Sequence, residues 1–201
     1  MIEYSFRPAT GADVAKVAEL VNAAYGHYVE RLGMLPRPMT DDYAEVIANQ
    51  RVTVAESHGN IMGVIVLTVD DEGFLIDNVA VAPSHRGEGI GRALLEFAEA
   101  EAHRMGFDSI HLYTHEKMTE NLAMYARIGY VEYDRRSHGE FFLVYMTKHL
   151  AEVAVRFHAV PQGILWIDST EQAWRQTTLN DCRSSVFAMA TAIGAVFAWV
   201  W

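Results

Sequence analysis

The sequence predicts a mixed α/β fold, with antiparallel hairpins first and a strand-helix-strand-helix-strand run after them. Two observations predict it. Runs rich in β-branched residues flank the turn residues 57–60, and after residue 83 the apolar residues change from strand-like to helical spacing. The composition of the 201 residues, 51% hydrophobic and 21% charged, is typical of a folded globular chain. We therefore expect a mixed sheet with helices packed on it.

The first half of the chain is expected to supply the hairpins. Residues 10–13 offer capping side chains before a helical run, whereas Gly33, Pro36 and Pro38 exclude regular structure. Residues 57–60 contain the Gly and Asn of a tight turn. The expected elements are a strand that begins at residue 2 and ends at Pro8, helices over 14–25 and 41–47, and strands over 52–55 and 61–69.

The second half is expected to alternate strands and helices. A β-branched strand over residues 74–81 leads into a break at 83–88, and the helix that follows ends near Gly106. The remaining expected elements are a strand over residues 109–114, a short helix over 121–128, a turn at 137–139 and a strand over 141–146.

The chain changes character after Leu150. All four tryptophans lie within residues 151–201, and no charged residue occurs from Ser184 to Trp201. We expect one domain over residues 1–150 and a C-terminal extension over 151–201 that is apolar at its end. Three alternatives stay open for the extension: a membrane anchor, a helix packed on the domain or on a twin subunit in a homodimer, and an addition with no selected role. A helix over the uncharged run would be about 27 Å long, short of a ~30 Å bilayer core, which favours packing.

Charge and cysteine content limit the partners. The net charge of -10 opposes contact with nucleic acid or anionic lipid and attracts a cationic amine. A single cysteine, Cys182, rules out an internal disulfide framework, and the histidines lack metal-ligand spacing, so no metal is expected. Residues 1–8 do not form a secretory signal, and we expect a cytoplasmic protein.

The glycine-rich loop after residue 81 indicates an anion site. A buried strand enters Arg86-Gly87-Glu88-Gly89-Ile90-Gly91-Arg92 and a helix leaves it. Unpaired backbone N–H groups and the positive end of the helix dipole therefore converge on the loop, and the glycines let a diphosphate approach closely. A P-loop would require Lys-Ser/Thr where this chain has Arg92-Ala93, and the glycine spacing does not fit the dinucleotide fingerprint.

Two motifs resemble those of the GCN5-related N-acetyltransferase (GNAT) family. Arg86, Gly89 and Gly91 match its Arg/Gln-x-x-Gly-x-Gly/Ala motif. Residues 120–130 resemble its later Asn-x-x-x-x-Tyr-x-x-x-Gly-Phe/Tyr signature, shifted because Asn121 and Tyr125 are four positions apart. The resemblance covers roughly residues 2–149 and implies that residues 1–150 are a GNAT domain with the acyl-CoA N-acyltransferase fold.

The resemblance also implies that acetyl-CoA is the co-substrate. In the family, the pantetheine arm lies between two separating strands and the pyrophosphate on the glycine loop. Asn121 either bonds to the cofactor or caps its helix. The implied cofactor-binding residues are Val79, Val81, Arg86, Gly87, Glu88, Gly89, Ile90, Gly91, Arg92 and Asn121.

Acetyl transfer to an amine requires a proton acceptor and a donor to the leaving thiolate. The resemblance implies that Tyr125 is this donor; the alternative is a packed aromatic side chain. Strand alternation places Asp77 on one face with Val79 and Val81, and Ile76, Asn78 and Ala80 on the other. Asp77, His115 and Glu116 compete as the base, and Asp77 in an apolar strand equally suits a structural partner.

Three functions remain open at this point. The first is an N-acetyltransferase that moves acetyl from acetyl-CoA to a primary amine of a small molecule by direct attack. The second is acetylation of a protein N-terminus or lysine, and the third is a non-catalytic acyl-CoA-binding domain. Four residues before the Pro-rich segment either line the amine pocket or belong to the core: Tyr25, His27, Tyr28 and Glu30.

Overall fold

The computed structural model describes residues 3–139, 141–150, 158–160 and 163–165. The chain divides into two compact units, Met1–Glu152 and Val153–Trp201. The described part of the second unit is a short antiparallel hairpin, β8 (His158–Val160) with β9 (Gly163–Leu165). The uncharged run that begins at Ser184 lies outside the described residues. Within the described ranges, no helix has the length and apolar character that crossing a membrane requires.

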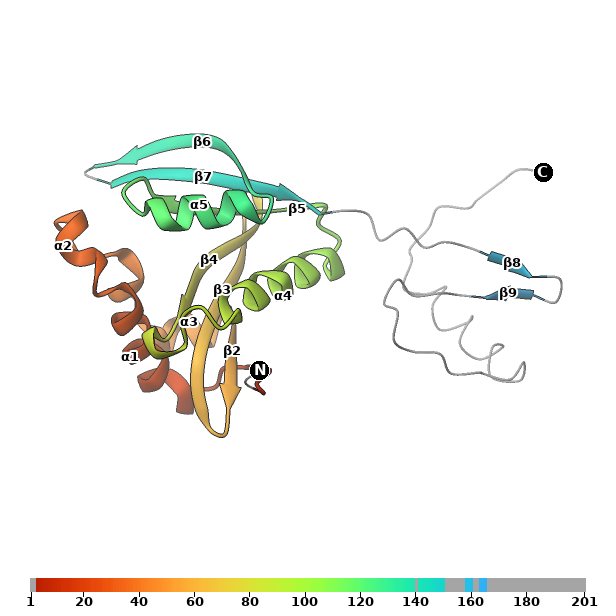
Figure 1. Ribbon diagram of the computed structural model, residues 1–201, viewed down its shortest axis with the longest axis horizontal. Helices are drawn as coiled ribbons and strands as arrows, with labels where there is room; N and C mark the ends of the chain where they lie inside the picture. The colour runs from red at the N-terminus through yellow and green to blue at the C-terminus, as the bar shows by residue number, and fades with distance from the viewer. Residues whose placement is uncertain (1–2, 140, 151–157, 161–162, 166–201) are drawn as a thin grey trace. The chain divides into compact units, whose positions relative to one another are not determined.

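The first unit is built on a seven-stranded sheet with the order β1-β2-β3-β4-β5-β7-β6 (Figure 1). Neighbouring strands are antiparallel except β4 and β5, which are parallel. This mixed sheet confirms the predicted fold class. The strands are β1 (Ser5–Pro8), β2 (Arg51–Ser57), β3 (Asn60–Asp70), β4 (Gly73–Val81), β5 (Ser109–His115), β6 (Val131–His138) and β7 (Phe141–His149).

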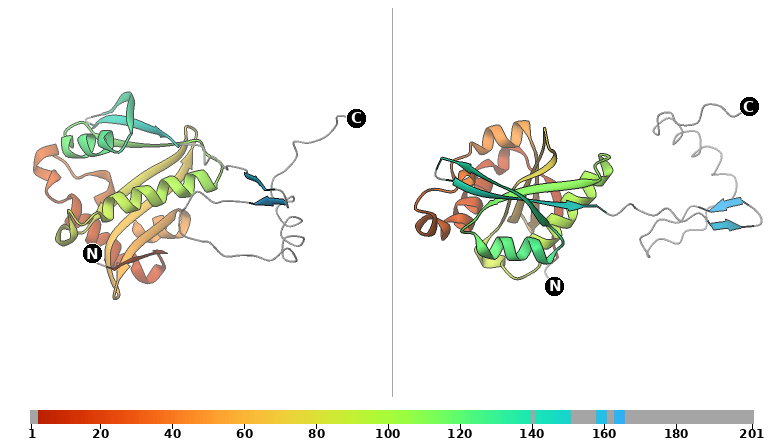
Figure 2. Two further views of the ribbon diagram at one scale, coloured as in Figure 1. Left: turned by 45° about the vertical axis from the view of Figure 1, so that its right-hand side comes forward. Right: turned by 90° about the horizontal axis from the view of Figure 1, so that it is seen from above.

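Helices cover both faces of the sheet (Figures 1 and 2). The helices are α1 (Val14–Tyr25), α2 (Tyr28–Leu32), α3 (Tyr43–Asn49), α4 (Ile90–Arg104) and α5 (Thr119–Arg127). Because successive strand residues point to opposite faces, β3 divides its side chains between two cores. Val64 and Val66 pack under α1, while Ile65 and Leu67 pack under α4.

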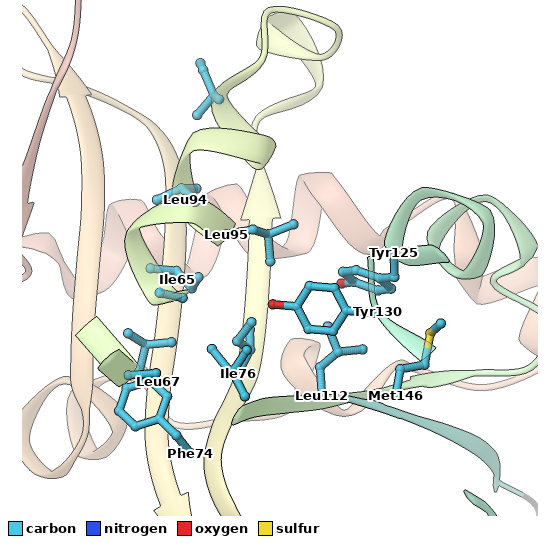
Figure 3. Close-up of a cluster of buried hydrophobic side chains, with 14 of the residues drawn as sticks. Ile65, Leu67, Phe74, Ile76, Leu94, Leu95, Leu112, Tyr125, Tyr130 and Met146 are labelled. Atoms are coloured by element: carbon cyan, nitrogen blue, oxygen red, sulfur yellow. The ribbon is translucent and has the colours of Figure 1, made fainter. Parts of the chain in front are cut away.

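The larger core lies between the sheet and the pair α4 and α5 (Figure 3). Leu94, Phe74 and Ile65 are fully buried there, and Tyr125 and Tyr130 close the end beneath α5. Each buried aliphatic or aromatic side chain of this size stabilises the fold by roughly 1.5–3 kcal/mol. The core therefore holds α4, and with it the glycine loop, firmly against β3 and β4.

The sheet opens between β4 and β5. The two strands pair only where Phe74–Ile76 faces Ile110–Leu112. Beyond this point β4 continues beside β3 and β5 continues beside β7, without pairing to each other. The β4 edge that faces β5 from Asp77 onward is therefore left without a strand partner.

A β-bulge at Asp77 marks the start of this opening. Leu67 pairs with Ile76 and the preceding Val66 pairs with Asn78, so Asp77 is an extra residue in β4. The bulge overturns the expected alternation. Ile76 packs in the same core as Val79 and Val81, instead of sharing a face with Asn78 and Ala80. The physical reason is that one inserted residue reverses the side-chain parity of everything after it.

Four of the described helices and strands were missed from the sequence: α2 and β6 in the first unit, and β8 and β9 in the second. The 3-10 turn Arg37–Met39 also lies where Pro36 and Pro38 were expected to exclude regular structure. β6 is an edge strand rich in charged residues, and edge strands carry such residues without an apolar alternation. α2 has only five residues, too few for helical periodicity to be visible. Other boundaries moved slightly: α3 begins after Asp42, whose carboxylate accepts a hydrogen bond from the N–H of Ala44, and α5 begins at Thr119.

Candidate active site

The glycine loop presents a run of free backbone donors. Gly89 is the N-cap of α4 with φ +86°, and Gly87 has φ +82°, a left-handed conformation that favours glycine. No side chain caps the helix. Among the described residues, no backbone N–H from Gly87 to Arg92 donates a hydrogen bond to a protein group. This run of donors at the positive end of a helix suits a diphosphate.

The side chains of the loop are engaged elsewhere. The Arg86 guanidinium donates to the carbonyl of Ala24, 2.7 Å away, at the C-terminal end of α1. Glu88 lies 2.9 Å from the imidazole of His85, and Arg92 donates to Glu96 one turn along α4. The loop therefore offers its backbone to an anion, while Arg86 ties the loop to α1.

The predicted pantetheine residues lie along the open edge of β4. Val79 and Val81 follow the bulge and are half-buried. The hydroxyl of Tyr25 donates to Asn78, 2.8 Å away, and approaches the carbonyl of Val79 at 3.3 Å. Tyr25 thus reaches from α1 to the strand edge. Its neighbour Tyr28 is buried with Leu32 and Met118, whereas His27 and Glu30 are exposed.

α5 supplies Tyr125 and Asn121. Tyr125 is 5% exposed, and its hydroxyl has no hydrogen-bond partner among the described residues. Burial raises the pKa of Tyr125 above its usual value, so the phenol stays protonated and able to donate. The side-chain oxygen of Asn121 accepts from Tyr28 at 3.3 Å. The helix cap is Met118, so the alternative that Asn121 caps α5 is wrong.

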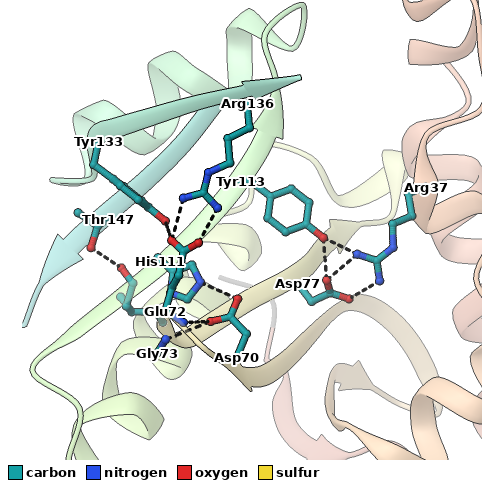
Figure 4. Close-up of polar contacts among 11 residues, drawn as sticks. Arg37, Asp70, Glu72, Gly73, Asp77, His111, Tyr113, Tyr133, Arg136 and Thr147 are labelled. Carbon is teal, nitrogen blue, oxygen red and sulfur yellow. Dashed lines mark hydrogen bonds and ion pairs between the residues drawn. The ribbon is translucent and has the colours of Figure 1, made fainter. Parts of the chain in front are cut away.

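Asp77 has two protein partners (Figure 4). Its Oδ1 accepts hydrogen bonds from Arg37 and from the hydroxyl of Tyr113, each 2.9 Å long, and its Oδ2 lies 3.3 Å from Arg37. The Asp77 side chain is 8% exposed. Burial raises the pKa of Tyr113, and the Asp77 carboxylate raises it further. The phenol therefore remains a donor to Asp77.

His115 and Glu116 follow at the end of β5. The Nδ1 of His115 accepts a hydrogen bond of 3.1 Å from the N–H of Lys117, which leaves the hydrogen of the neutral ring on Nε2. Burial lowers the pKa of His115, and the charge of Lys117 lowers it further. The carboxylate of Glu116 is 40% exposed and lies 4.0 Å from Arg135. Glu116 is therefore more exposed than Asp77, whereas His115 is about as buried as Asp77 and differs from it in its partners.

Sequence reasoning missed Arg37 and Tyr113. Arg37 lies in a 3-10 turn, Arg37–Met39, between α2 and α3. A signal existed for Tyr113, because alternation along β5 separates it from the buried Leu112 and Thr114. Nothing in the local sequence marks Arg37 as a partner of a residue 40 positions away. In the described part of the chain, no group of three or more His, Cys, Asp or Glu side chains could hold a metal ion.

Known proteins are similar to this chain in sequence. Residues 48–132 match the family model of an acetyltransferase (GNAT) domain. N-acetyltransferase family 8 member 3 of Rattus norvegicus is 34% identical over 101 residues, which cover 47% of this chain and 42% of that protein. N-alpha-acetyltransferase 80 of Mus musculus is 45% identical over 56 residues, which cover 28% of this chain and 17% of that protein. IAA acetyltransferase of Azospirillum brasilense is 32% identical over 84 residues, which cover 41% of this chain and 55% of that protein. The chain thus spans about half, or less, of the length of these relatives.

A solved structure shares the fold. The paiA N-acetyltransferase of Thermoplasma acidophilum, in complex with coenzyme A, superposes with a TM-score of 0.62 at 16% identity. The match covers 74% of this chain and 99% of that one. The fold implied by the two sequence motifs is therefore confirmed.

Proposed function

This chain carries a GNAT domain, and on that premise we propose that it transfers an acetyl group from acetyl-CoA to a primary amine of a small molecule. The amine attacks the thioester directly within a ternary complex, without a covalent enzyme intermediate. The observation that carries the proposal is that two sets of free backbone hydrogen-bonding groups lie next to each other. The unpaired edge of β4 adjoins a loop whose backbone donors from Gly87 to Arg92 are free.

We assign the cofactor to these two features. The backbone of Val79 and Val81 would hold the pantetheine amides along the open edge of β4. The loop from Arg86 to Arg92 would hold the pyrophosphate through its N–H groups, since the Arg86 and Arg92 side chains already have partners. Asn121 extends the same surface from α5. Acetyl-CoA supplies the activated acetyl group, and the protein positions it.

Tyr125 is the proposed donor to the departing thiolate. It is protonated, its hydroxyl has no described partner, and it comes from the helix that follows β5. Charge that develops on sulfur during the reaction would be stabilised by this donor. The base remains one of Asp77, His115 and Glu116. The Nδ1 contact of His115 makes direct proton transfer to its ring require a rearrangement, whereas Asp77 keeps one unoccupied lone pair, on Oδ2.

Local charge supports a cationic acceptor. The single positive charge of Arg37 faces two carboxylates, Asp77 at 2.9 Å and Asp41 at 3.6 Å, so the group carries a net charge of -1 (+1 − 2). A protonated amine is attracted to such a site and an anion is repelled. The names of the relatives indicate different acceptors, since one is N-alpha-acetyltransferase 80 and another is IAA acetyltransferase. Acetylation of protein amines is therefore the second candidate.

The test is release of free thiol from acetyl-CoA with a panel of acceptors. The panel contains polyamines, amino acid derivatives, amino sugars, and peptides with a free N-terminus or lysine. Thiol release with a small amine, and a product heavier by one acetyl group, is the expected result. Release with peptides alone would favour the protein acceptor. Tight acetyl-CoA binding without any thiol release would indicate a non-catalytic acyl-CoA-binding domain.

A further inference from the structure

The sheet opening is bridged by side chains from three separate segments (Figure 4). The last paired positions of β4 and β5 are Ile76 and Leu112, and the next residues are Asp77 and Tyr113. The Tyr113 hydroxyl donates to Asp77 across the point where the strands part. Arg37 contacts both, with its guanidinium on the Asp77 carboxylate and beside the Tyr113 hydroxyl. These three residues form a clamp at the vertex of the opening.

The clamp fastens the segment 36–43 to the bulge. The segment 36–43 is attached to β4 at a second point, one residue further along the strand, where the side-chain amide of Asn78 donates to the hydroxyl of Tyr43. Tyr43 in turn donates to the carbonyl of Pro38 at 2.9 Å. The bulge thus brings two successive β4 side chains onto the same segment. Without Arg37, the turn that carries it would keep its packing against α1 and its contact with Tyr43 but would lose its attachment to the vertex.

The clamp also occupies Asp77. Oδ1 accepts two hydrogen bonds and Oδ2 faces the second guanidinium nitrogen, so both carboxylate oxygens are engaged. Both lone pairs of Oδ1 are therefore used, and a proton arriving from an amine could reach only the remaining lone pair of Oδ2, beside the Arg37 guanidinium. A forked guanidinium-carboxylate contact of this kind fixes position as well as charge.

We propose that Arg37 is a positioning residue that fastens the segment 36–43 to the vertex through Asp77 and Tyr113, and so sets where the acceptor amine approaches. Asp77 is its anchor and not the proton acceptor. The part of the inference that concerns the amine rests on the proposed function, which assigns the pantetheine arm to the open edge of β4. The anchoring itself rests on the contacts alone.

Two measurements on the full chain test the proposal. The variants are Arg37→Gln, Asp77→Asn and the double variant, with Arg37→Lys as the conservative replacement. Arg104→Gln is the matched control, since Arg104 forms an ion pair with Glu101 near the C-terminus of α4 and lies outside the clamp. Amide hydrogen exchange of residues 36–43 reports anchoring without any need for activity. Kinetics with the best amine, across pH, report positioning.

The expected results follow from the contact that Arg37 and Asp77 share, which either substitution breaks. Exchange of residues 36–43 rises roughly tenfold in Arg37→Gln and Asp77→Asn but not in the control. The value of kcat/KM for the amine falls roughly tenfold to a hundredfold in either variant, and the double variant is no worse. Acetyl-CoA affinity changes less than about twofold, the acidic limb of the pH-rate profile stays in place, and Arg37→Lys recovers part of the loss.

Other outcomes overturn the proposal in distinguishable ways. Unchanged exchange in Arg37→Gln means that the segment is not fastened by Arg37. Near-complete loss of turnover in Asp77→Asn alone, or an acidic limb that moves when Arg37 is removed, makes Asp77 the proton acceptor. If the natural chain releases no thiol with any amine while the exchange result holds, the acetyltransferase function fails and the anchoring stands.

Discussion

Tyr125 and Tyr130 lie side by side at the end of the core, with ring centroids 5.8 Å apart, and their hydroxyl groups differ (Figure 3). The hydroxyl of Tyr130 is sealed from solvent and forms no hydrogen bond of normal geometry among the described residues, although the carboxylate of Glu99 lies close enough to raise its pKa. The hydroxyl of Tyr125 is not sealed. Burial raises the pKa of both phenols. At the scale of the residue, the two phenols thus differ in that only the hydroxyl of Tyr130 is fully enclosed.

Tyr125→Phe should lower kcat roughly a hundredfold and change acetyl-CoA affinity less than about twofold. The variant keeps the ring packing and removes a donor to charge that develops only during reaction. Stopped-flow thiol release and calorimetry check the two quantities. An equal loss in both would reassign Tyr125 to cofactor binding, and no loss in either would make it a packing residue.

Tyr130→Phe is the matched control and carries a prediction of its own. Removing a buried hydroxyl without a partner should raise the free energy of unfolding by about 1 kcal/mol, because a desolvated polar group disappears. Turnover should stay at the natural level. Urea unfolding followed by far-UV circular dichroism measures the stability. A fall in stability would show that the hydroxyl has a partner.

At the scale of the element, the loop before α4 depends on backbone conformation. Gly89 has φ +86°, and the space where a Cβ would lie is open. A substitution there is therefore resisted by the left-handed conformation and not by crowding. The same holds for Gly59, φ +81°, in the turn between β2 and β3, which lies outside the glycine loop.

Gly89→Val should weaken acetyl-CoA binding at least about tenfold while the fold survives, because a left-handed β-branched residue costs roughly 1–2 kcal/mol and turns the donors away. Gly59→Val imposes similar strain outside the proposed site and should bind acetyl-CoA normally. Calorimetry compares the two variants. Unchanged affinity in Gly89→Val would count decisively against the loop as the pyrophosphate site.

A second element-scale feature joins the turn after β3 to β6 (Figure 4). The carboxylate of Glu72 accepts hydrogen bonds from Arg136 and from the hydroxyl of Tyr133. These contacts lower the pKa of Glu72 to about 2, with Arg136 the larger cause. Arg136 also lies 4.0 Å from the centre of the Tyr145 ring. The network attaches the edge hairpin β6–β7 to the central strands.

Arg136→Gln should lower the melting temperature slightly at pH 7, and the difference from the natural chain should shrink as the pH falls from about 4.5 toward 2. A carboxylate with a lowered folded pKa stabilises the fold above its unfolded value and loses this contribution as it is protonated. Solvent keeps the effect small because Glu72 is exposed. Arg135→Gln is the control, and a difference independent of pH would assign the effect to lost packing.

At the scale of the whole molecule, the first compact unit contains every proposed site residue. Its last strand, β7, pairs with β5 from Leu143 to His149, and the N–H of Leu150 donates to the carbonyl of Asp108 just after that strand. The domain is thus closed at Leu150 by hydrogen bonds of its own. The assignment of residues 151–201, the homodimer and the cytoplasmic location stay predictions.

A chain that ends after Leu150 should bind acetyl-CoA as the full chain does, within about twofold, since it keeps the whole proposed site. Its oligomeric state or solubility should change if the apolar end packs on protein. Calorimetry and light scattering on both chains measure this. Lost acetyl-CoA binding in a folded short chain would place part of the site in the extension, and partition of the full chain into detergent would favour the anchor.

The sequence by itself determined the fold class and the position of the glycine loop. Both depend on local chemistry, namely side-chain periodicity and glycine at left-handed positions, which short segments express wherever they lie. Only the tertiary structure decided what surrounds them. The bulge at Asp77 appears in the pairing with β3, and the Arg37 contact joins residues 40 positions apart. Such contacts depend on how distant segments converge, and no local pattern encodes that.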